Sequence, residues 1–204
     1  MKSLILIFFT LCTYNIFAQS DSVAAINDIL AFQKELNNEY KNHKESPLDP
    51  KDFRKFKSHP FFPINLAYRV NAKLIETPGT PVLLLKTTTT RLANDRVYGF
   101  LEFTINGKAF RLPVYQSPDL MKQAEYVDYL FFPFSDLTNG TQTYAGGRYI
   151  DLRIPKEGND IIIDFNKAYN PYCAYSHRFS CPIVPAENQM DIEIPVGVMY
   201  NQKK

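Results

Sequence analysis

The chain has 204 residues, and its 23 basic residues nearly balance its 21 acidic ones, which leaves a formal net charge of +2. Lysines and acids are interspersed, so the chain lacks the basic stripe that neutralises nucleic-acid phosphates. We therefore expect no nucleic-acid partner. Once a short N-terminal segment is set aside, the remaining length is that of a single domain.

The first 18 residues have the composition of an export signal. A basic residue is followed by an apolar stretch at residues 4–11, and Ala18 stands before a plausible cleavage site. The apolar stretch is shorter than the roughly 20 residues that cross a bilayer, and no later segment is long and apolar enough to do so. We therefore expect an exported protein, periplasmic or secreted, that is cleaved near Ala18 and has no membrane span. Lipid attachment at Cys12 is the alternative.

Residues 19–63 are expected to form a helix and a proline-rich connector that pack on the rest of the chain. Ser20 or Asp21 can cap a helix that runs from about Val23 to Tyr40. The apolar residues expected to dock this helix follow its 3.6-residue period; they are Val23, Ile26, Leu30, Phe32 and Leu36. The residues expected to anchor the connector to the core are Phe53, Phe56, Phe61 and Phe62.

From residue 64 to residue 204 the sequence has the pattern of a β-rich domain. Apolar and polar residues alternate in short runs, and Asn106-Gly107 separates two of them, which is the strongest short-range signal for a hairpin. The expected strands cover residues 66–74, 82–90, 96–105, 108–115, 129–134, 148–154, 161–165 and 190–196. Short strands at this spacing predict a mainly β fold, either an antiparallel β-sandwich or a partly closed barrel, with an N-terminal α-helix.

The segment at residues 164–188 concentrates cysteine, aromatic and amide side chains. Connecting loops are usually short and polar, so we expect this segment to be an ordered unit. Cys173 and Cys181 are expected to form one disulfide in an exported protein. With His177 they recur at intervals of four, which would suit zinc, but no fourth ligand is evident and export favours oxidation of the thiols. We therefore expect no metal and no other cofactor.

Polar and aromatic side chains in this segment and in residues 134–149 are candidates for a binding site. Tyrosines offer flat faces with a hydroxyl, asparagines offer donors and acceptors, and an arginine can hold a carboxylate through two parallel hydrogen bonds. The candidate ligand-binding residues are Asp136, Tyr144, Arg148, Asp164, Asn166, Tyr169, Asn170 and Asn188. The expected ligand is a small polar molecule or a cell-envelope component.

Two alternatives use the same residues differently. In the first, the protein is a carboxylate-dependent hydrolase in which Asp164 acts with Glu187 or Asp136, and both carboxyl groups face one cavity. In the second, the polar residues only hold the fold together, and function lies on a surface that contacts a partner. The sequence leaves open whether the protein is an enzyme, and it leaves the oligomeric state open as well.

Three ordered blocks of sequence are distinctive: FSDLTNGTQTYAGGRY at residues 134–149, DFNKAYNPYCAY at residues 164–175 and CPIVPAEN at residues 181–188. Together they resemble the motifs of the DUF1684 family, which is defined by unknown function. Val184 departs from the family pattern, in which a proline is usual at that position. The resemblance covers nearly all of the chain after the export signal. It implies a bacterial, often exported protein, and it brings no established activity.

Overall fold

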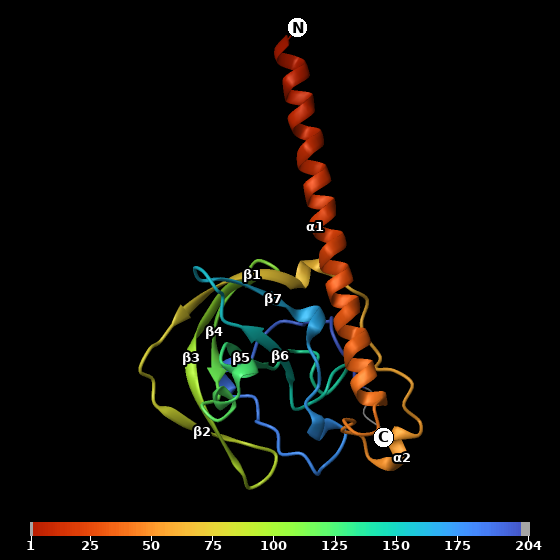
Figure 1. Cartoon of the computed structure of the whole chain (residues 1–204), viewed down its shortest axis with the longest axis vertical. Helices are drawn as coiled ribbons and strands as arrows, with labels where there is room; N and C mark the ends of the chain where they lie inside the picture. The colour runs from red at the N-terminus through yellow and green to blue at the C-terminus, as the bar shows by residue number, and fades with distance from the viewer. Residues whose placement is uncertain (1, 201–204) are drawn as a thin grey trace.

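A seven-stranded sheet curls into a nearly closed barrel, and one long helix lies beside it (Figure 1). The computed structural model describes residues 2–200 and the side chains of residues 21–200. The helices are α1 (Lys2–Lys41) and α2 (Pro50–Phe53), and the strands are β1 (Arg69–Glu76), β2 (Val82–Lys86), β3 (Leu92–Ile105), β4 (Lys108–Gln116), β5 (Tyr129–Phe134), β6 (Arg148–Arg153) and β7 (Asp160–Asp164). The short 3-10 helices are η1 (Leu66–Tyr68), η2 (Leu120–Lys122), η3 (Ala124–Tyr126), η4 (Phe165–Lys167), η5 (Tyr172–Ala174) and η6 (Ala186–Asn188).

The sheet is antiparallel, with the strand order β6-β5-β4-β3-β1-β7 and with β2 paired to β3 outside this path. Ile105 pairs with Lys108 across a two-residue turn in which Asn106 and Gly107 have φ of 50° and 76°. This geometry confirms the predicted hairpin. The end strands β6 and β7 come together, so the predicted partly closed barrel with an N-terminal helix is also confirmed. β1 begins later than predicted and β2 ends earlier.

The structure contradicts the strand predicted at residues 190–196. The alternating apolar pattern is present, but Pro195 cannot donate a hydrogen bond to a neighbouring strand. Arg148 instead donates to the backbone carbonyls of Ile194 and Val196. Backbone hydrogen bonds to Ser135 and Leu137 therefore hold residues 188–192, and the buried Arg148 side chain holds residues 194–196.

Alternation along the strands buries two faces of the sheet. The inner face carries the main hydrophobic core, which includes Leu101 and Phe132. The outer face of the neighbouring strands β4, β5 and β6 carries a second cluster that includes Tyr115, Phe131 and Tyr149. The segment with the two cysteines packs on this second cluster, so part of the sheet is covered on both sides.

Helix α1 docks through a stripe that only partly matches the prediction: Leu36 is buried and Phe32 packs beside it, as expected, but Val23, Ile26 and Leu30 are exposed. The buried residues of its described part are Ala25, Ile29, Leu36 and Tyr40. By contrast, Val23 and Leu30 are 52% and 49% exposed. Both stripes follow helical spacing, so the period alone could not decide which one would dock. Three of the four connector phenylalanines, Phe53, Phe56 and Phe61, pack on the cluster around Tyr40 rather than on the main core.

The start of the helix also differs from the prediction. Ser20 and Asp21 do not cap its N-terminus, because α1 is continuous from Lys2 to Lys41 and contains no glycine or proline that would interrupt it. The export signal expected at residues 1–18 lies outside the described side chains. Within the described part of the chain, no helix is long and apolar enough to cross a membrane.

Candidate functional site

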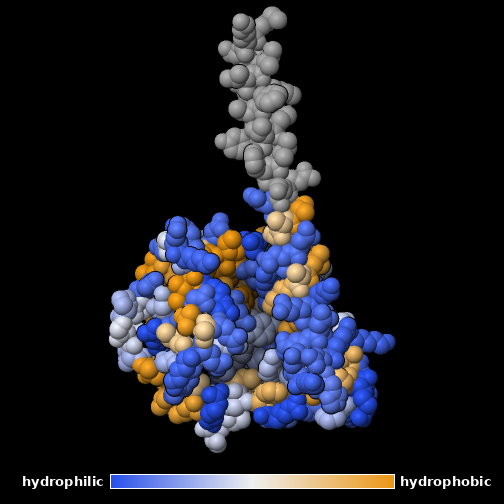
Figure 2. Space-filling view, in the orientation of Figure 1, coloured by the Kyte–Doolittle hydropathy of each residue, from blue (hydrophilic) through white to orange (hydrophobic). Residues whose placement is uncertain are grey.

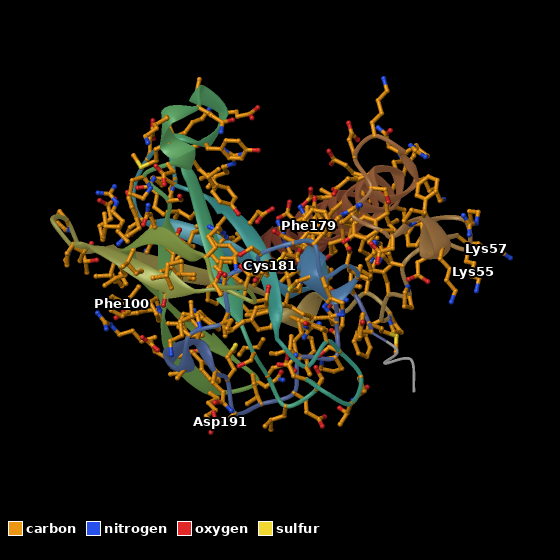
Figure 3. All side chains as sticks on the ribbon, turned by 90° about the horizontal axis from the view of Figure 1, so that it is seen from below. Lys55, Lys57, Phe100, Phe179, Cys181 and Asp191 are labelled. Atoms are coloured by element: carbon orange, nitrogen blue, oxygen red, sulfur yellow. The ribbon has the colours of Figure 1, made fainter. Side chains whose placement is uncertain are left out.

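A cleft of about 790 Å³ lies between α1 and the outer face of the sheet. Figure 2 shows the surface hollowed between the barrel and α1, and Figure 3 shows Phe179 and Cys181 near the base of the gap. The volume is within the range of small-molecule sites, which is roughly 300–1,000 Å³. Among the residues that line the cleft are Glu39, Asp95, Tyr129, Phe131, Asp151 and Tyr169.

Strand register brings residues from three strands, β3, β5 and β6, into the lining of the cleft. Tyr115 of β4 pairs with Phe131 of β5, which pairs with Asp151 of β6, so these three side chains lie on one face. Val97 of β3 pairs with Tyr115, and Asp95 comes two residues earlier, so Asp95 lies on the same face. Backbone pairing therefore determines the relative positions of Asp95 and Asp151, which are far apart in sequence.

Two tyrosine hydroxyls hold the Asp151 carboxylate. Tyr129 and Tyr169 each donate to its Oδ1 at 2.7 Å, and no described residue donates to its Oδ2. Burial raises the pKa of Asp151, and the two hydroxyls act in the opposite direction. Burial and the neighbouring carboxylate raise the pKa of both tyrosines, so they remain protonated donors.

The opposite wall of the cleft comes from α1. Glu39 accepts a hydrogen bond from the hydroxyl of Tyr172, and burial raises the pKa of this carboxyl group. Lys167 binds Asp28 of α1 at 2.7 Å and lies over the Phe32 ring at 6.0 Å. These contacts connect the helix to the segment after β7, so both walls of the cleft are held in place.

Asp95 is the buried acid of the cleft, and it has no partner among the residues whose side chains are described. It is only 5% exposed, and its carboxylate makes no hydrogen bond or ion pair with them. Burial raises the pKa of Asp95, and the positive charge of Arg91 acts against this rise. Arg91 donates to Ser180, to Oγ at 3.1 Å and to the backbone oxygen at 2.7 Å, and not to the carboxylate.

Two of the predicted site residues form a buried ion pair away from the cleft. Arg148 is fully buried and donates to Oδ2 of Asp136 at 2.8 Å, as well as to two backbone carbonyls. Oδ1 of Asp136 accepts from the backbone and hydroxyl of Thr138 at 2.9 and 2.6 Å, and from the backbone of Ile194 at 3.1 Å. Both carboxylate oxygens are therefore used inside the protein.

A second buried group contains Asp164 and Asn166. Asp164 accepts from the backbone and side chain of Asn166 at 3.0 and 2.9 Å, and from Arg69 at 3.0 Å. Asn166 also exchanges two hydrogen bonds with the backbone of Asn65, at 2.9 and 3.0 Å. These contacts join the end of β7 to the turn before β1, which is a structural role.

The other predicted residues are divided between the fold and the cleft. Asn188 bonds the Tyr115 hydroxyl at 3.1 Å and a backbone carbonyl, and Asn170 donates to the Tyr175 hydroxyl at 2.9 Å. Tyr144 packs edge-on against Tyr200 with ring centroids 5.2 Å apart, and burial raises its pKa to about 12. Tyr169 alone of the eight predicted residues lines the cleft.

The two catalytic carboxylate pairs considered from the sequence do not face this cleft. Asp164 and Asp136 are occupied by internal partners, and Glu187 is exposed outside the cleft lining. Among the residues that the structure describes, no group of three or more His, Cys, Asp or Glu could hold a metal ion. The arrangement in the cleft is suited to binding polar groups through carboxylates and hydroxyls.

The two cysteines of the expected disulfide are buried and present as free thiols. The backbone N–H of Cys173 points to Sγ of Cys181 at 3.3 Å, and a hydrogen bond between the thiols lowers the pKa of Cys173. The two residues are therefore adjacent, and their oxidation stays a prediction.

Sequence reasoning missed Asp95, Tyr129 and Asp151. Asp95 precedes the residue at which a strand was predicted to begin, so it was not assigned to a face of the sheet. Asp151 follows Tyr149 at an alternate position in β6, which places an acid beside an aromatic residue on one face of the strand. That local signal was present in the sequence, but the tyrosines that bind Asp151 come from other parts of the chain.

Taken together, these features define a small antiparallel barrel with a cleft between the sheet and a helix, lined by aromatic and acidic side chains. The family model described as "Protein of unknown function (DUF1684)" matches residues 54–199. The chain belongs to this family. The resemblance of the three sequence blocks is thereby confirmed, whereas the expected bacterial origin and export are untested.

A solved structure has the same fold. It is the solution NMR structure of the uncharacterized protein from gene locus rrnAC0354 of Haloarcula marismortui, with a TM-score of 0.72 and 29% sequence identity. The alignment covers 91% of this chain and 99% of that chain. This coverage extends well beyond residues 54–199, so the similarity includes much of α1. A search among curated proteins finds no match.

Proposed function

We propose that the protein binds a small polar ligand in the cleft between α1 and the outer face of the sheet. The ligand class is the one expected from the sequence, but the binding residues are those of the cleft. The proposal depends on the Asp151 carboxylate. Two tyrosine hydroxyls donate to one of its oxygens, and the other oxygen has no partner among the described residues. Such a carboxylate is a preorganised acceptor, because its orientation is set before a ligand arrives.

Export is part of the proposal. Cleavage near Ala18 would place the cleft in the periplasm or outside the cell, where a free polar molecule or a cell-envelope component could enter it. The described docking residues of α1 begin at Ala25, so cleavage would leave the helix wall complete. In that compartment Cys173 and Cys181 would pair as a disulfide. Intact-mass analysis of the secreted protein tests both points, through an N-terminus at Gln19 and the loss of two hydrogens.

A thermal-shift screen of small polar molecules against the cleaved protein tests the binding proposal. A ligand at 100 times its Kd stabilises the folded state by about 2.7 kcal/mol, which corresponds to roughly 5–10 °C in Tm for a chain of this size. Asp151→Asn is expected to reduce the shift produced by every ligand that binds in the cleft, because it removes the charged acceptor.

Asp191→Asn is the matched control. Asp191 is exposed, pairs with Lys108 and lies on the side of the molecule away from the cleft (Figure 3). Its substitution should leave every ligand-induced shift unchanged. The proposal fails if ligands that stabilise the protein do so equally in wild type and in Asp151→Asn, or if a broad screen of neutral, cationic and anionic molecules gives no shift.

A further inference from the structure

The cleft has an excess of negative charge. Its acidic lining residues are Glu35, Glu39, Asp95, Asp119 and Asp151, and its basic lining residues are Arg91 and Lys167. Both cations already have protein partners: Arg91 bonds Ser180, and Lys167 binds Asp28. A ligand that enters the cleft therefore meets more free carboxylate than free cation.

Asp95 gives this charge excess a specific anchor. A buried carboxylate without a partner is costly, so buried acids in proteins are normally paired or hydrogen-bonded. The other two buried acids follow this rule, since Asp136 is bound by Arg148 and Asp164 by Arg69. Asp95 is buried to a similar extent as a residue and is the exception among the described acids, while its carboxylate oxygens remain accessible from the cleft. The missing partner is the kind of group that a ligand would supply.

The surroundings of Asp95 suit an organic cation better than a metal ion. Divalent metal ions need several oxygen ligands in one shell, and the described residues form no group of three potential ligands. Tyr129, Phe131 and Tyr149 instead line the cleft with aromatic side chains. Aromatic rings attract ammonium groups and also pack against the carbon chain that carries them.

We infer that the ligand of this cleft is a small organic ammonium compound whose charged nitrogen is bound by Asp95. This inference rests on the proposed function and specifies its ligand class. An ammonium group has three donors and no acceptor, so it can satisfy Asp95 and still donate to a second oxygen. Oδ2 of Asp151 lies three strands away on the same face of the sheet, so it suits a second donor at the other end of the ligand.

Isothermal titration with matched probes tests the ligand class. The cationic probes are 1,4-diaminobutane and spermidine, the neutral probe is 1,4-butanediol, and the anionic probe is succinate. All are titrated at neutral pH into the wild-type protein. We expect the amines to bind at least tenfold more tightly than the diol, because a hydrogen bond between two charged groups is stronger than one to a neutral hydroxyl. We expect no binding of succinate.

Asp95→Asn provides the second arm of the experiment. The amide has nearly the same shape but no charge, so affinity for the amines should fall at least tenfold. The Tm of the ligand-free variant should not fall, because the substitution removes a buried charge that has no partner. A merely structural Asp95 would give the reverse pattern, with a lower Tm and unchanged affinity. Asp191→Asn again serves as the control and should change neither quantity.

The outcomes separate this inference from the proposed function. If the diol or succinate binds as tightly as the amines and Asp151→Asn weakens that binding, the cleft is a site but the cationic class is overturned. The class is also overturned if the amines bind equally well to wild type and Asp95→Asn, or if neither amine binds while other molecules in the screen do. If no molecule in the screen shifts the Tm and none of the four probes binds, the binding proposal itself fails.

Discussion

Two polar regions of this protein look alike in composition and behave differently in the structure. In the buried groups around Arg148 and Asp164, each carboxylate is paired with an arginine and bonded to backbone or amide groups. In the cleft, by contrast, Asp95 has no partner and Asp151 uses only one oxygen among the described residues. The comparison teaches that a polar motif marks a binding site only when the fold leaves its hydrogen-bonding capacity unused.

The largest expected effect comes from Arg148→Met, in the region where the partners are complete. Removing the guanidinium leaves the Asp136 carboxylate buried without its cation, which should cost about 3–5 kcal/mol in the free energy of unfolding. Urea denaturation measures this loss. Adding Asp136→Asn should recover part of it, because the uncompensated charge is also removed. A loss below about 1 kcal/mol in the single variant would show that the ion pair contributes little to the stability of the fold.

A pH-dependent effect of comparable size is expected from His59, which lies under α1. It is 5% exposed, its ring centroid is 4.2 Å from that of Tyr40, and its backbone N–H donates to Asn37 at 2.7 Å. Burial lowers the pKa of His59 from 6.5 to about 4, so the folded state holds it neutral. The unfolded chain takes up the proton first as pH falls. The contribution is therefore complete above pH 6.5 and is lost between pH 6.5 and 4, by roughly 3 kcal/mol.

Unfolding free energies of wild type and His59→Gln, measured across this pH range, test that sign and size. The variant should show a shallower loss of stability between pH 6.5 and 4, because glutamine does not titrate. His177→Gln is the matched control, since His177 is exposed on the surface. Identical pH profiles for wild type and His59→Gln would contradict the prediction.

A somewhat smaller effect is expected from Gly147→Ala, which tests how tightly the motif before β6 is packed. Gly147 has φ of +87°, and a Cβ there would lie 2.7 Å from the backbone oxygen of Phe134 and 2.6 Å from Cγ2 of Val184. We expect a loss of about 2–3 kcal/mol from strain and contact together. Gly79→Ala is the control, because Gly79 has φ of +80° and open space around it, and should cost about 1 kcal/mol. If urea denaturation gives the same loss of unfolding free energy for Gly147→Ala and Gly79→Ala, the backbone at Gly147 is not closely packed.

The smallest effect on stability is expected in the cleft, from Tyr169→Phe. It removes one of the two hydroxyls that donate to Asp151 and should cost about 1 kcal/mol or less. The pKa of Asp151 should rise further, because a donor that stabilises the carboxylate is lost. Carbon NMR titration of the carboxyl group measures this change. Tyr126→Phe is the control, since Tyr126 packs against Tyr129 without bonding Asp151; an unchanged Asp151 pKa in Tyr169→Phe would contradict the hydrogen bond.

Much of the barrel could be predicted from local sequence. Period-two alternation predicted seven of the strands, and the Asn106-Gly107 turn predicted the central hairpin, because strand faces and tight turns depend on near neighbours. The same reasoning failed at residues 190–196, where an alternating pattern was present. There the backbone of Ile194 and Val196 is bound by Arg148, and the backbone of Met190 and Ile192 by residues 135–137, all more than 40 positions earlier in the chain.

The sequence by itself determined the strand pattern, the hairpin, the family and the ordered character of segment 164–188. Only the tertiary structure decided which polar residues keep free hydrogen-bonding capacity. Arg148 and Asp164 stand in conspicuous motifs and lie inside the fold, whereas Asp95 and Asp151 stand in ordinary strands and line the cleft. The physical reason is that a side chain's partners are set by strand register and by the docking of α1, and both depend on residues far apart along the chain.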